Sequence, residues 1–397
     1  MALAIAMGTA SCSQGSSDNR SVAPCPVFSD LSQGLPVTRG WRTNPSLADV
    51  NGDGYLDLAA TNRKGEGPKV FLYDPAKGWL PSSEGIRLDM YSCGVGVELK
   101  DVTGDARIDL LVADHCTGLY LFQGDGQGRW ERVVKQRHPS GEGFNDASAG
   151  DLNGDGRTDL VALAAFTTGF SLFEKREDGS FAGLKSGLPR SGGGYEVGLA
   201  DLDGDGMMDI YATLQGTHPG SRARGEREAK VWLQKPGGTW EAGSGLPETG
   251  NFYGMAAGDI NKDGFVDLVL SRTDYEGGVL VFLGKGQGVW ELLAGSQPGE
   301  APGRLMAGVA LSDLDQDGNL DLIAVERTKP AVVAWIGDGS GKFTECGGGP
   351  VLPRSEGPGW GLAVGDVTKD GHPDVVAGFG SEAGGALKAW ATRPPAR

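Results

Sequence analysis

The segment Asp313–Asp321 reads DLDQDGNLD, and it stands between two apolar runs, GVALS before it and DLIAVE from its last aspartate onward. The same pattern recurs along the chain, as DVNGDGYLD from Asp49, DVTGDARID from Asp101, DLNGDGRTD from Asp151, DLDGDGMMD from Asp201, DINKDGFVD from Asp259 and DVTKDGHPD from Asp366. Successive copies start 52, 50, 50, 58, 54 and 53 residues apart. A regular period of this length indicates a repeat protein with one supersecondary unit per copy.

Each period has room for four short strands. One apolar run ends at the first aspartate of the pattern and a second begins at the last, while a fourth strand follows a glycine-rich turn that ends in an aromatic residue such as Trp130 or Trp290. The second runs are apolar at nearly every position, as expected for strands covered on both faces. Because four antiparallel strands make one propeller blade, the sequence predicts an all-β, seven-bladed β-propeller.

The last blade has to be completed from elsewhere. After the seventh copy only two further strands fit, DVVAGFG and ALKAWAT. The segment VFSDLSQGLP at 27–36 matches the outer-strand segments Phe181–Pro189 and Thr239–Pro247. We therefore predict that residues 27–36 complete blade 7 and remove an open sheet edge. The predicted organisation is a leader and polar tether at 1–24 followed by a single propeller at 25–397.

The repeated pattern offers side-chain oxygens at loop positions 1, 3, 5 and 9 and a backbone carbonyl at position 7. Hard oxygen donors in a flexible loop favour Ca²⁺. An EF-hand would need a glutamate at position 12, where every copy here has alanine, valine or leucine. The sequence thus predicts up to seven calcium sites, with Thr103, Thr368 and the missing glycine at Ala106 as the departures from the pattern. The predicted ligands are Asp49, Asn51, Asp53, Tyr55 and Asp57; Asp101, Thr103, Asp105, Arg107 and Asp109; Asp151, Asn153, Asp155, Arg157 and Asp159; Asp201, Asp203, Asp205, Met207 and Asp209; Asp259, Asn261, Asp263, Phe265 and Asp267; Asp313, Asp315, Asp317, Asn319 and Asp321; and Asp366, Thr368, Asp370, His372 and Asp374.

The net charge follows from these loops. The chain carries −16, and 23 of its 52 acidic residues are aspartates at positions 1, 3, 5 and 9 of the pattern. Seven calcium ions would bring the charge to about −2, so the acidity is explained by metal loops rather than by a basic partner. An acidic chain also lacks the positive surface that nucleic-acid binding needs.

The loops, the period and the aromatic turns resemble the FG-GAP or VCBS repeat family, which includes the propeller of integrin α subunits. The resemblance covers about residues 27 to 395. It implies that the calcium loops lie on one face and that ligands bind on the opposite face. Related propellers include sugar-binding lectins and accessory domains of polysaccharide-degrading enzymes, so the resemblance specifies fold more closely than function.

On the face opposite the loops the repeats stop being alike. Five and six residues ahead of the first loop aspartate, blades differ in a mixture of aromatic and hydrogen-bonding residues that suits a sugar or peptide site. The alternative is that the rings only plug the channel. The candidate ligand-binding residues are Asn44, Asn145, Asp146, Tyr195, Glu196, Tyr253 and Trp360.

Motifs for catalysis are scarce. The chain has no G-x-S-x-G, H-E-x-x-H, P-loop or C-x-x-C motif, and it has four histidines. The leading hypothesis is therefore a non-catalytic module, monomeric, that binds glycan or protein. The alternatives are a polysaccharide lyase or related enzyme, with Tyr195, Glu196 or His218 as acid or base, and a purely structural surface protein.

The cysteines and the first residues indicate an extracellular location. MALAIAMGTASCSQGSS resembles a bacterial lipoprotein signal in which Cys12 is lipidated, although it lacks an early basic residue. No apolar run is long enough for a membrane helix. If Lys100 pairs with Asp109, Cys93 lies directly opposite Cys116, so we predict a disulfide there. Cys25 and Cys346 fall on outer strands of different blades and stay unassigned.

Overall fold

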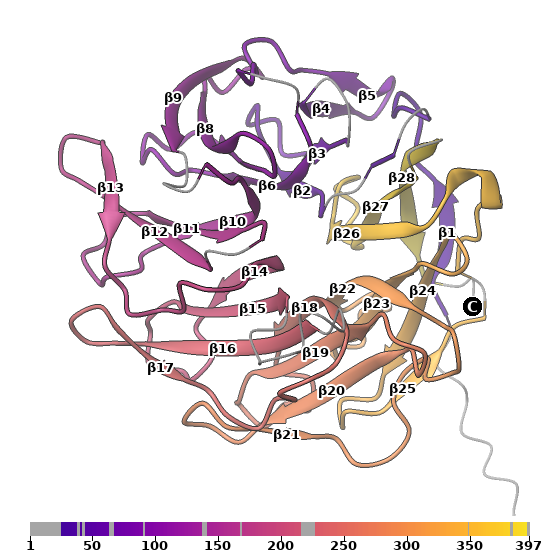
Figure 1. The fold of residues 1–397 in the computed structure, drawn as a ribbon. Coiled ribbons are helices and arrows are strands. Elements are labelled where there is room, and N and C mark those ends of the chain that lie inside the picture. Colours follow the sequence, from indigo (N-terminus) through magenta and orange to yellow (C-terminus); the bar gives the residue numbers. More distant parts are fainter. Residues whose placement is uncertain are drawn as a thin grey trace, which may run out of the picture.

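The computed structural model describes residues 25–37, 40–41, 44–62, 67–89, 92–136, 141–166, 169–215, 227–347, 349–381 and 384–394. These residues form seven four-stranded antiparallel sheets that are arranged as blades around a central axis (Figure 1). The first strand of each blade lies closest to the axis and the fourth lies at the rim (Figure 1). The predicted seven-bladed, all-β propeller is confirmed. Cys12 and His218 lie outside the described residues.

The blades contain the following strands, from the axis to the rim. Blade 1 has β2 (Ser46–Ala48), β3 (Asp57–Thr61), β4 (Pro68–Asp74) and β5 (Gly78–Pro81), and blade 2 has β6 (Val95–Lys100), β7 (Asp109–Asp114), β8 (Gly118–Gly124) and β9 (Trp130–Gln136). Blade 3 has β10 (Phe144–Gly150), β11 (Asp159–Ala164), β12 (Phe170–Lys175) and β13 (Phe181–Leu184), and blade 4 has β14 (Gly194–Ala200), β15 (Asp209–Gln215), β16 (Arg227–Lys235) and β17 (Thr239–Ala242). Blade 5 has β18 (Phe252–Gly258), β19 (Asp267–Arg272), β20 (Val279–Gly284) and β21 (Trp290–Leu292), and blade 6 has β22 (Met306–Ser312), β23 (Asp321–Glu326), β24 (Ala331–Gly337) and β25 (Phe343–Glu345). Blade 7 has β26 (Gly359–Gly365), β27 (Asp374–Gly380), β28 (Gly385–Arg393) and β1 (Val27–Asp30).

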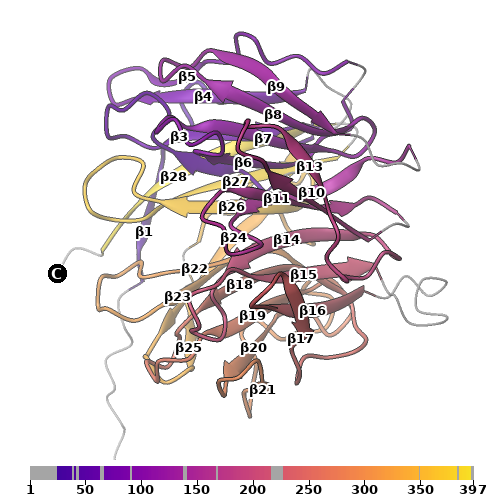
Figure 2. The same ribbon diagram turned by 90° about the vertical axis from the view of Figure 1, so that its left-hand side faces the viewer.

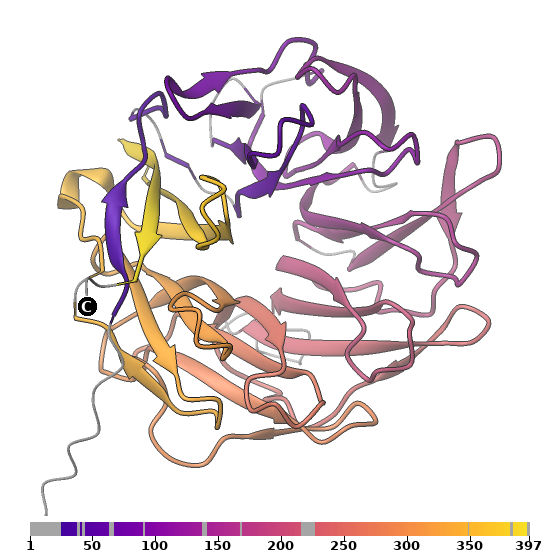
Figure 3. The same cartoon turned by 180° about the vertical axis from the view of Figure 1, so that it is seen from behind.

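The ring is closed by the N-terminal strand, as predicted. β1 pairs antiparallel with β28, with Val27 opposite Arg393 and Asp30 opposite Trp390. Seen from behind, β1 lies beside β28 at the rim of the last blade (Figure 3). Blade 7 is therefore made from both ends of the described chain, and its two halves hold the ring together by backbone hydrogen bonds.

Apolar packing lies between blades rather than within them. The second strands are almost wholly buried, as in β11 and β23, because both faces of each blade pack against a neighbouring sheet. Seven apolar clusters are found among the described residues, and the one that joins blades 2 and 3 contains Leu111, Leu121 and Phe144. The side view shows the blades stacked along the ring without an intervening helical layer (Figure 2).

The aromatic turn of blade 2 fastens its rim to the preceding blade. Trp130, at the start of β9, donates from Nε1 to the carbonyl of Ser82 in blade 1, at 2.9 Å, and its own backbone N–H donates to Glu84. Gly85 has φ +92°, and a Cβ there would lie 1.8 Å from the Trp130 carbonyl oxygen. Glycine is thus required at position 85 because the backbone of Trp130 packs directly against it.

Helix is nearly absent from the described part of the chain. The one helical element there is the 3₁₀ turn η1 (Arg354–Glu356). Within those residues no helix has the length and apolar character needed to cross a membrane.

Candidate functional site

The acidic loops lie at one end of the inner strands, where each strand 1 leads into strand 2. In the first loop Asp49 accepts backbone N–H groups from Gly52 and Asp53 through Oδ1 and from Gly54 through Oδ2, at 2.8 to 3.1 Å. Asp53 accepts the N–H of Tyr55 at 2.9 Å. Short carboxylate side chains shape the loop by binding their own backbone, which is why aspartate and glycine alternate in the sequence.

The last aspartate of every loop is buried and begins strand 2. In blade 1 Asp57 accepts the N–H of Val50 from its own loop and the N–H of Tyr73 from strand 3, both at 2.9 Å. Burial, opposed by these two hydrogen bonds and assisted by the neighbouring carboxylates Asp53 and Asp49, raises the pKa of Asp57 to about 7. The same cause raises the pKa of Asp321 to about 7 and that of Asp159 to about 6.

Two of the loops bring at least three carboxylates together. One oxygen each from Asp201, Asp203 and Asp209, and likewise from Asp313, Asp315 and Asp317, lie within 4.8 Å of one another. The Oδ1 atom of Asp203 is buried and has no hydrogen-bond partner. Converging hard oxygens, one of them buried and without a partner, suit a hard divalent cation that takes six to eight oxygen ligands.

At four left-handed bends of the loops a residue with a side chain stands where other loops have glycine: Ala106 at position 6, and Lys262, Gln316 and Lys369 at position 4, with φ of +59°, +60° and +58°. Ala106 holds φ +64°, in the left-handed region where a side chain costs about 1 kcal/mol. Its N–H still donates to Asp101 at 2.8 Å, so the second loop keeps the hydrogen-bonding pattern of the others.

At the other end of the inner strands, three rings from three blades meet. The centroids of Tyr195 and Tyr253 are 5.4 Å apart, and those of Tyr253 and Trp360 are 5.9 Å apart. The guanidinium of Arg327 stands 4.1 Å from the Trp360 ring centroid and 5.6 Å from that of Tyr253. We call Tyr195, Tyr253, Trp360 and Arg327 the aromatic cluster.

Backbone irregularities place these rings. The pairing register shifts between Gly194 and Glu196, and between Phe252 and Met255, so that Tyr195 and Tyr253 lie in bulges. A bulge changes the direction of a side chain at a sheet edge. Trp360, also at a register shift, is 6% exposed and donates from Nε1 to Gly380 at 2.6 Å. Among the three rings the two tyrosines keep more of their surface exposed.

The candidate residues of blade 3 serve contacts between blades. The Oδ1 atom of Asn145 is 2.6 Å from Nδ1 of His115. The Nδ2 group of Asn145 donates to the carbonyl oxygen of Gly194, also at 2.6 Å. Asp146 Oδ2 accepts the N–H of Val197 at 2.9 Å. Asn145 and Asp146 are 5% and 7% exposed, so in this structure they join blades 2, 3 and 4 and are poorly accessible to a ligand.

Three acids that interact with one another, Glu98, Asp146 and Glu196, lie on the first strands of blades 2, 3 and 4. Burial and the neighbouring Asp146 raise the pKa of Glu196 well above its ordinary value, against hydrogen bonds from the Met255 N–H and the Asn44 side chain. Burial raises the pKa of Asp146 to about 7 and also raises that of Glu98. Tyr211 is affected by the same three acids, and its pKa is raised mainly by burial. The Oε2 of Glu196 is buried without a partner.

Because the pKa values of these acids are raised in the folded state, we expect their contribution to the free energy of unfolding to fall as pH rises. Asp146 has a folded-state pKa near 7 and an unfolded-state value near 3.8, so its cost to folding appears above pH 4 and is complete above pH 7. The variant Asp146→Asn keeps an acceptor for Val197 and should unfold with a free energy up to about 4 kcal/mol higher at pH 8, with little change at pH 4. Urea titrations at both pH values measure this, with the exposed-site variant Glu131→Gln as control. An Asp146→Asn protein with the pH dependence of the parent contradicts the prediction.

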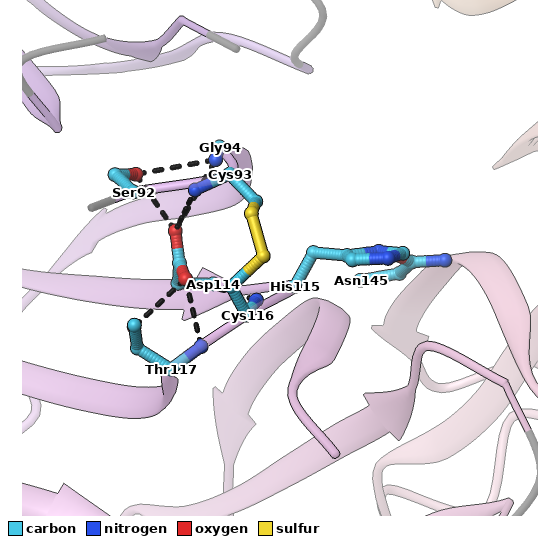
Figure 4. The surroundings of a disulfide bond; sticks show 8 residues. All are labelled: Ser92, Cys93, Gly94, Asp114, His115, Cys116, Thr117 and Asn145. Carbon is cyan, nitrogen blue, oxygen red and sulfur yellow. Dashed lines mark hydrogen bonds between the residues drawn. A yellow bond between two sulfur atoms is a disulfide. The ribbon is translucent and has the colours of Figure 1, made fainter. Parts of the chain in front are cut away.

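Two disulfides are present among the described cysteines. Strands β6 and β7 pair in the predicted register, with Lys100 opposite Asp109, and Cys93 is bonded to Cys116 with Cα atoms 5.6 Å apart. Asp114, fully buried, accepts hydrogen bonds from residues on both sides of this bond, among them Ser92 at 2.7 Å and Thr117 at 2.9 Å (Figure 4). The second disulfide joins Cys25 to Cys346, again with Cα atoms 5.5 Å apart.

Sequence reasoning missed two residues on this face of the ring. Arg327 follows β23 of blade 6, and His115 follows β7 of blade 2 beside Phe166, whose ring centroid is 4.6 Å away. Both come from turns between strands 2 and 3 of their blades. In a propeller these turns lie on the same face as the residues ahead of strand 1. A charged or aromatic residue in such a turn is therefore a candidate for the same site.

The sequence and the fold have relatives. Residues 101–162, 263–324 and 313–377 match the FG-GAP-like repeat family. Human integrin alpha-7 is 33% identical over 143 residues, which is 32% of this chain and 11% of that protein, so the match spans a small part of the integrin's length.

Solved structures with the same overall fold include two crystal structures of BBS1N in complex with ARL6DN, one soaked with mercury and one with lead. In both cases the TM-score is 0.56 at 12% identity, with 94% of this chain and 98% of the other covered. At that identity the likeness concerns the fold alone.

Proposed function

Because this chain is an integrin-like propeller built from FG-GAP-like repeats, we propose that it is an extracellular, non-catalytic binding module that recognises glycan or protein ligands at the aromatic cluster. The observation that carries the proposal is the meeting of Tyr195, Tyr253 and Trp360 at the end of the inner strands away from the acidic loops. Large rings with polar tips supply contact area at low entropic cost and dominate binding energy in many interfaces.

The acidic loops have a separate role in this proposal. We propose that they bind calcium and stabilise the ring, because their carboxylates crowd together at bends where burial alone already disfavours the charged form. A cation among them offsets both the repulsion and the cost of burial. The two disulfides are consistent with an oxidising exterior.

Ligand recognition is tested by binding to a glycan array and to a panel of purified extracellular proteins, each in calcium and in EGTA. We expect a ligand whose affinity falls at least about tenfold in Tyr253→Ala, because truncating an interfacial aromatic residue commonly costs more than 1 kcal/mol. Trp360→Ala serves as a second variant, although its buried indole also supports folding.

Phe265→Ala is the matched control, since that ring is exposed on an acidic loop at the opposite face. Binding that survives Tyr253→Ala but is lost in Phe265→Ala would place the ligand on the loop face and overturn the proposed site. Formation of unsaturated sugar products with ultraviolet absorbance, on incubation with polysaccharides, would instead establish an enzyme.

A further inference from the structure

The seven acidic loops differ in a residue that lies outside them. In each blade the Oδ1 of the last loop aspartate accepts a backbone N–H from strand 3, namely that of Tyr73, Gly124, Lys175, Gln234, Gly284, Gly337 or Thr392. The next residue along the chain, at or directly after the end of strand 3, is in an equivalent position in all blades. It is Asp74, Asp125, Arg176, Lys235, Lys285, Asp338 and Arg393 in blades 1 to 7. We call it the strand 3 position.

In blade 4 this residue reaches back into its own loop. Lys235 Nζ donates to Asp203 Oδ2 at 2.7 Å and lies 3.6 Å from Asp205 Oδ2. Asp203 has 8% of its side chain exposed, and its other oxygen, Oδ1, is buried without a partner. Asp203 and Asp205 are positions 3 and 5 of the loop, so the ammonium sits on carboxylates that the proposed calcium would need.

Blade 7 has the same arrangement with a guanidinium. Arg393 forms ion pairs with Asp370, at loop position 5, and with Asp374, at position 9, where the nitrogen–oxygen distance is 3.8 Å. The equivalent residue of blade 5, Lys285, turns away and pairs with Glu291 on its own outer strand at 3.4 Å. A basic residue at the strand 3 position therefore does not pair with its loop in every blade. Lys235 and Arg393 do so, whereas Lys285 does not.

Blade 6 provides an internal comparison. Its loop has the same four carboxylates as that of blade 4, at positions 1, 3, 5 and 9. Its strand 3 position is Asp338, which accepts the N–H groups of Ser340 and Lys342 in the following turn. Across the described residues, no lysine or arginine forms an ion pair with the carboxylates of the blade 6 loop.

We propose that Lys235 and Arg393 are built-in counter-ions that compete with calcium, so that the loops of blades 4 and 7 bind calcium more weakly than the loop of blade 6. Blades 2 and 3 are left out of this comparison, because Arg107 and Arg157 pair with Asp105 and Asp155 from within their own loops. This inference rests on the proposed calcium binding. A divalent ion entering the blade 4 loop must displace an ammonium from Asp203 or share the carboxylate with it, and both lower the affinity. When calcium is scarce, the basic residue offsets part of the negative charge of these two loops.

The ion pairs of Arg393 also bear on closure of the ring, because blade 7 is the blade that closes it. Arg393 belongs to β28 and lies opposite Val27 of β1, in the pair of strands that closes the ring. A loop held by its own arginine keeps that blade ordered without metal. The other loops can then lose or gain calcium while the ring remains closed.

The test is hydrogen–deuterium exchange read by mass spectrometry over a series of free calcium concentrations, which follows each loop peptide separately. In the parent protein the 201–209 loop should need about tenfold more calcium for half-maximal protection than the 313–321 loop, the size expected for one charge-assisted hydrogen bond. Lys235→Gln should shift the midpoint of the 201–209 loop to lower calcium and leave that of the 313–321 loop unchanged. Lys285→Gln is the matched control and should change neither.

The possible midpoints separate the counter-ion role from calcium binding itself. Equal midpoints for the two loops in the parent, or a 201–209 midpoint that Lys235→Gln does not move, overturn the counter-ion role while leaving calcium binding intact. If no loop gains protection at any calcium concentration, calcium binding itself fails, and the inference fails with it. A second measurement checks the apo state: in EGTA, Lys235→Gln should melt below the parent and Lys285→Gln should not.

Discussion

In excess EGTA the protein should melt more than about 10 °C below its melting temperature in millimolar calcium. Each loop that binds calcium at a concentration one hundredfold above its Kd adds about 2.7 kcal/mol to the free energy of unfolding, and several loops act on one ring. Without metal, carboxylates such as Asp49, Asp53 and Asp57 repel one another, and buried Asp57 already has a raised pKa. Removing calcium therefore lowers the free energy of unfolding in two ways: the binding energy is lost, and the carboxylates are no longer screened from one another.

The measurement is thermal unfolding followed by circular dichroism or calorimetry, in matched buffers with calcium, magnesium or EGTA. Magnesium at the same ionic strength should restore little, since it prefers fewer protein ligands and keeps its waters. Superimposable melting curves in calcium and EGTA would show that the loops are held by their own hydrogen bonds.

Loss of the Cys25–Cys346 disulfide should destabilise the protein more than loss of Cys93–Cys116. The first bond spans 321 residues and the second 23. In the chain-entropy account of cross-links these separations correspond to about 6 and about 3.5 kcal/mol. The difference should appear as a melting temperature several degrees lower in the Cys25→Ala, Cys346→Ala protein than in the Cys93→Ala, Cys116→Ala protein.

A local readout separates the two variants further. Exchange protection of the β1 amides should fall when Cys25 is removed, because β1 is then held by β28 and by no covalent link to blade 6. The same amides should keep their protection in the Cys93→Ala, Cys116→Ala protein. Equal melting temperatures and unchanged β1 protection in the two variants would mean that the ring closure does not depend on the disulfide.

The sequence was enough to predict the ring because its repeated loops mark the strand ends. In every blade the last loop aspartate begins strand 2, and its burial against strand 3 ties three strands to one residue. The same regularity predicted that residues 27–36 complete blade 7, since their pattern matches other outer strands. It also predicted the register of β6 and β7, which follows from a loop of fixed length.

Features that join different blades were not accessible in the same way. The pairing of Cys25 with Cys346 depends on how the outer strands of blades 6 and 7 approach each other, and no periodicity describes that. The bulges around Tyr195 and Tyr253 are likewise invisible in the residue pattern, yet they bring the rings together. Sequence alone could nominate Asn145 and Asp146 for a ligand, whereas their burial between blades is a tertiary property.

The Cys25–Cys346 bond also determines how the propeller responds to mechanical load. Tension applied to the chain before Cys25 passes through the covalent bond into Cys346, beside β25 of blade 6, and does not reach β1. The hydrogen bonds between β1 and β28 are thus mechanically in parallel with a covalent strap and carry little of the force. A propeller with this connection can be pulled from its N-terminal side without its closing strand being peeled from the ring, and in a reducing medium the same pull acts directly on β1.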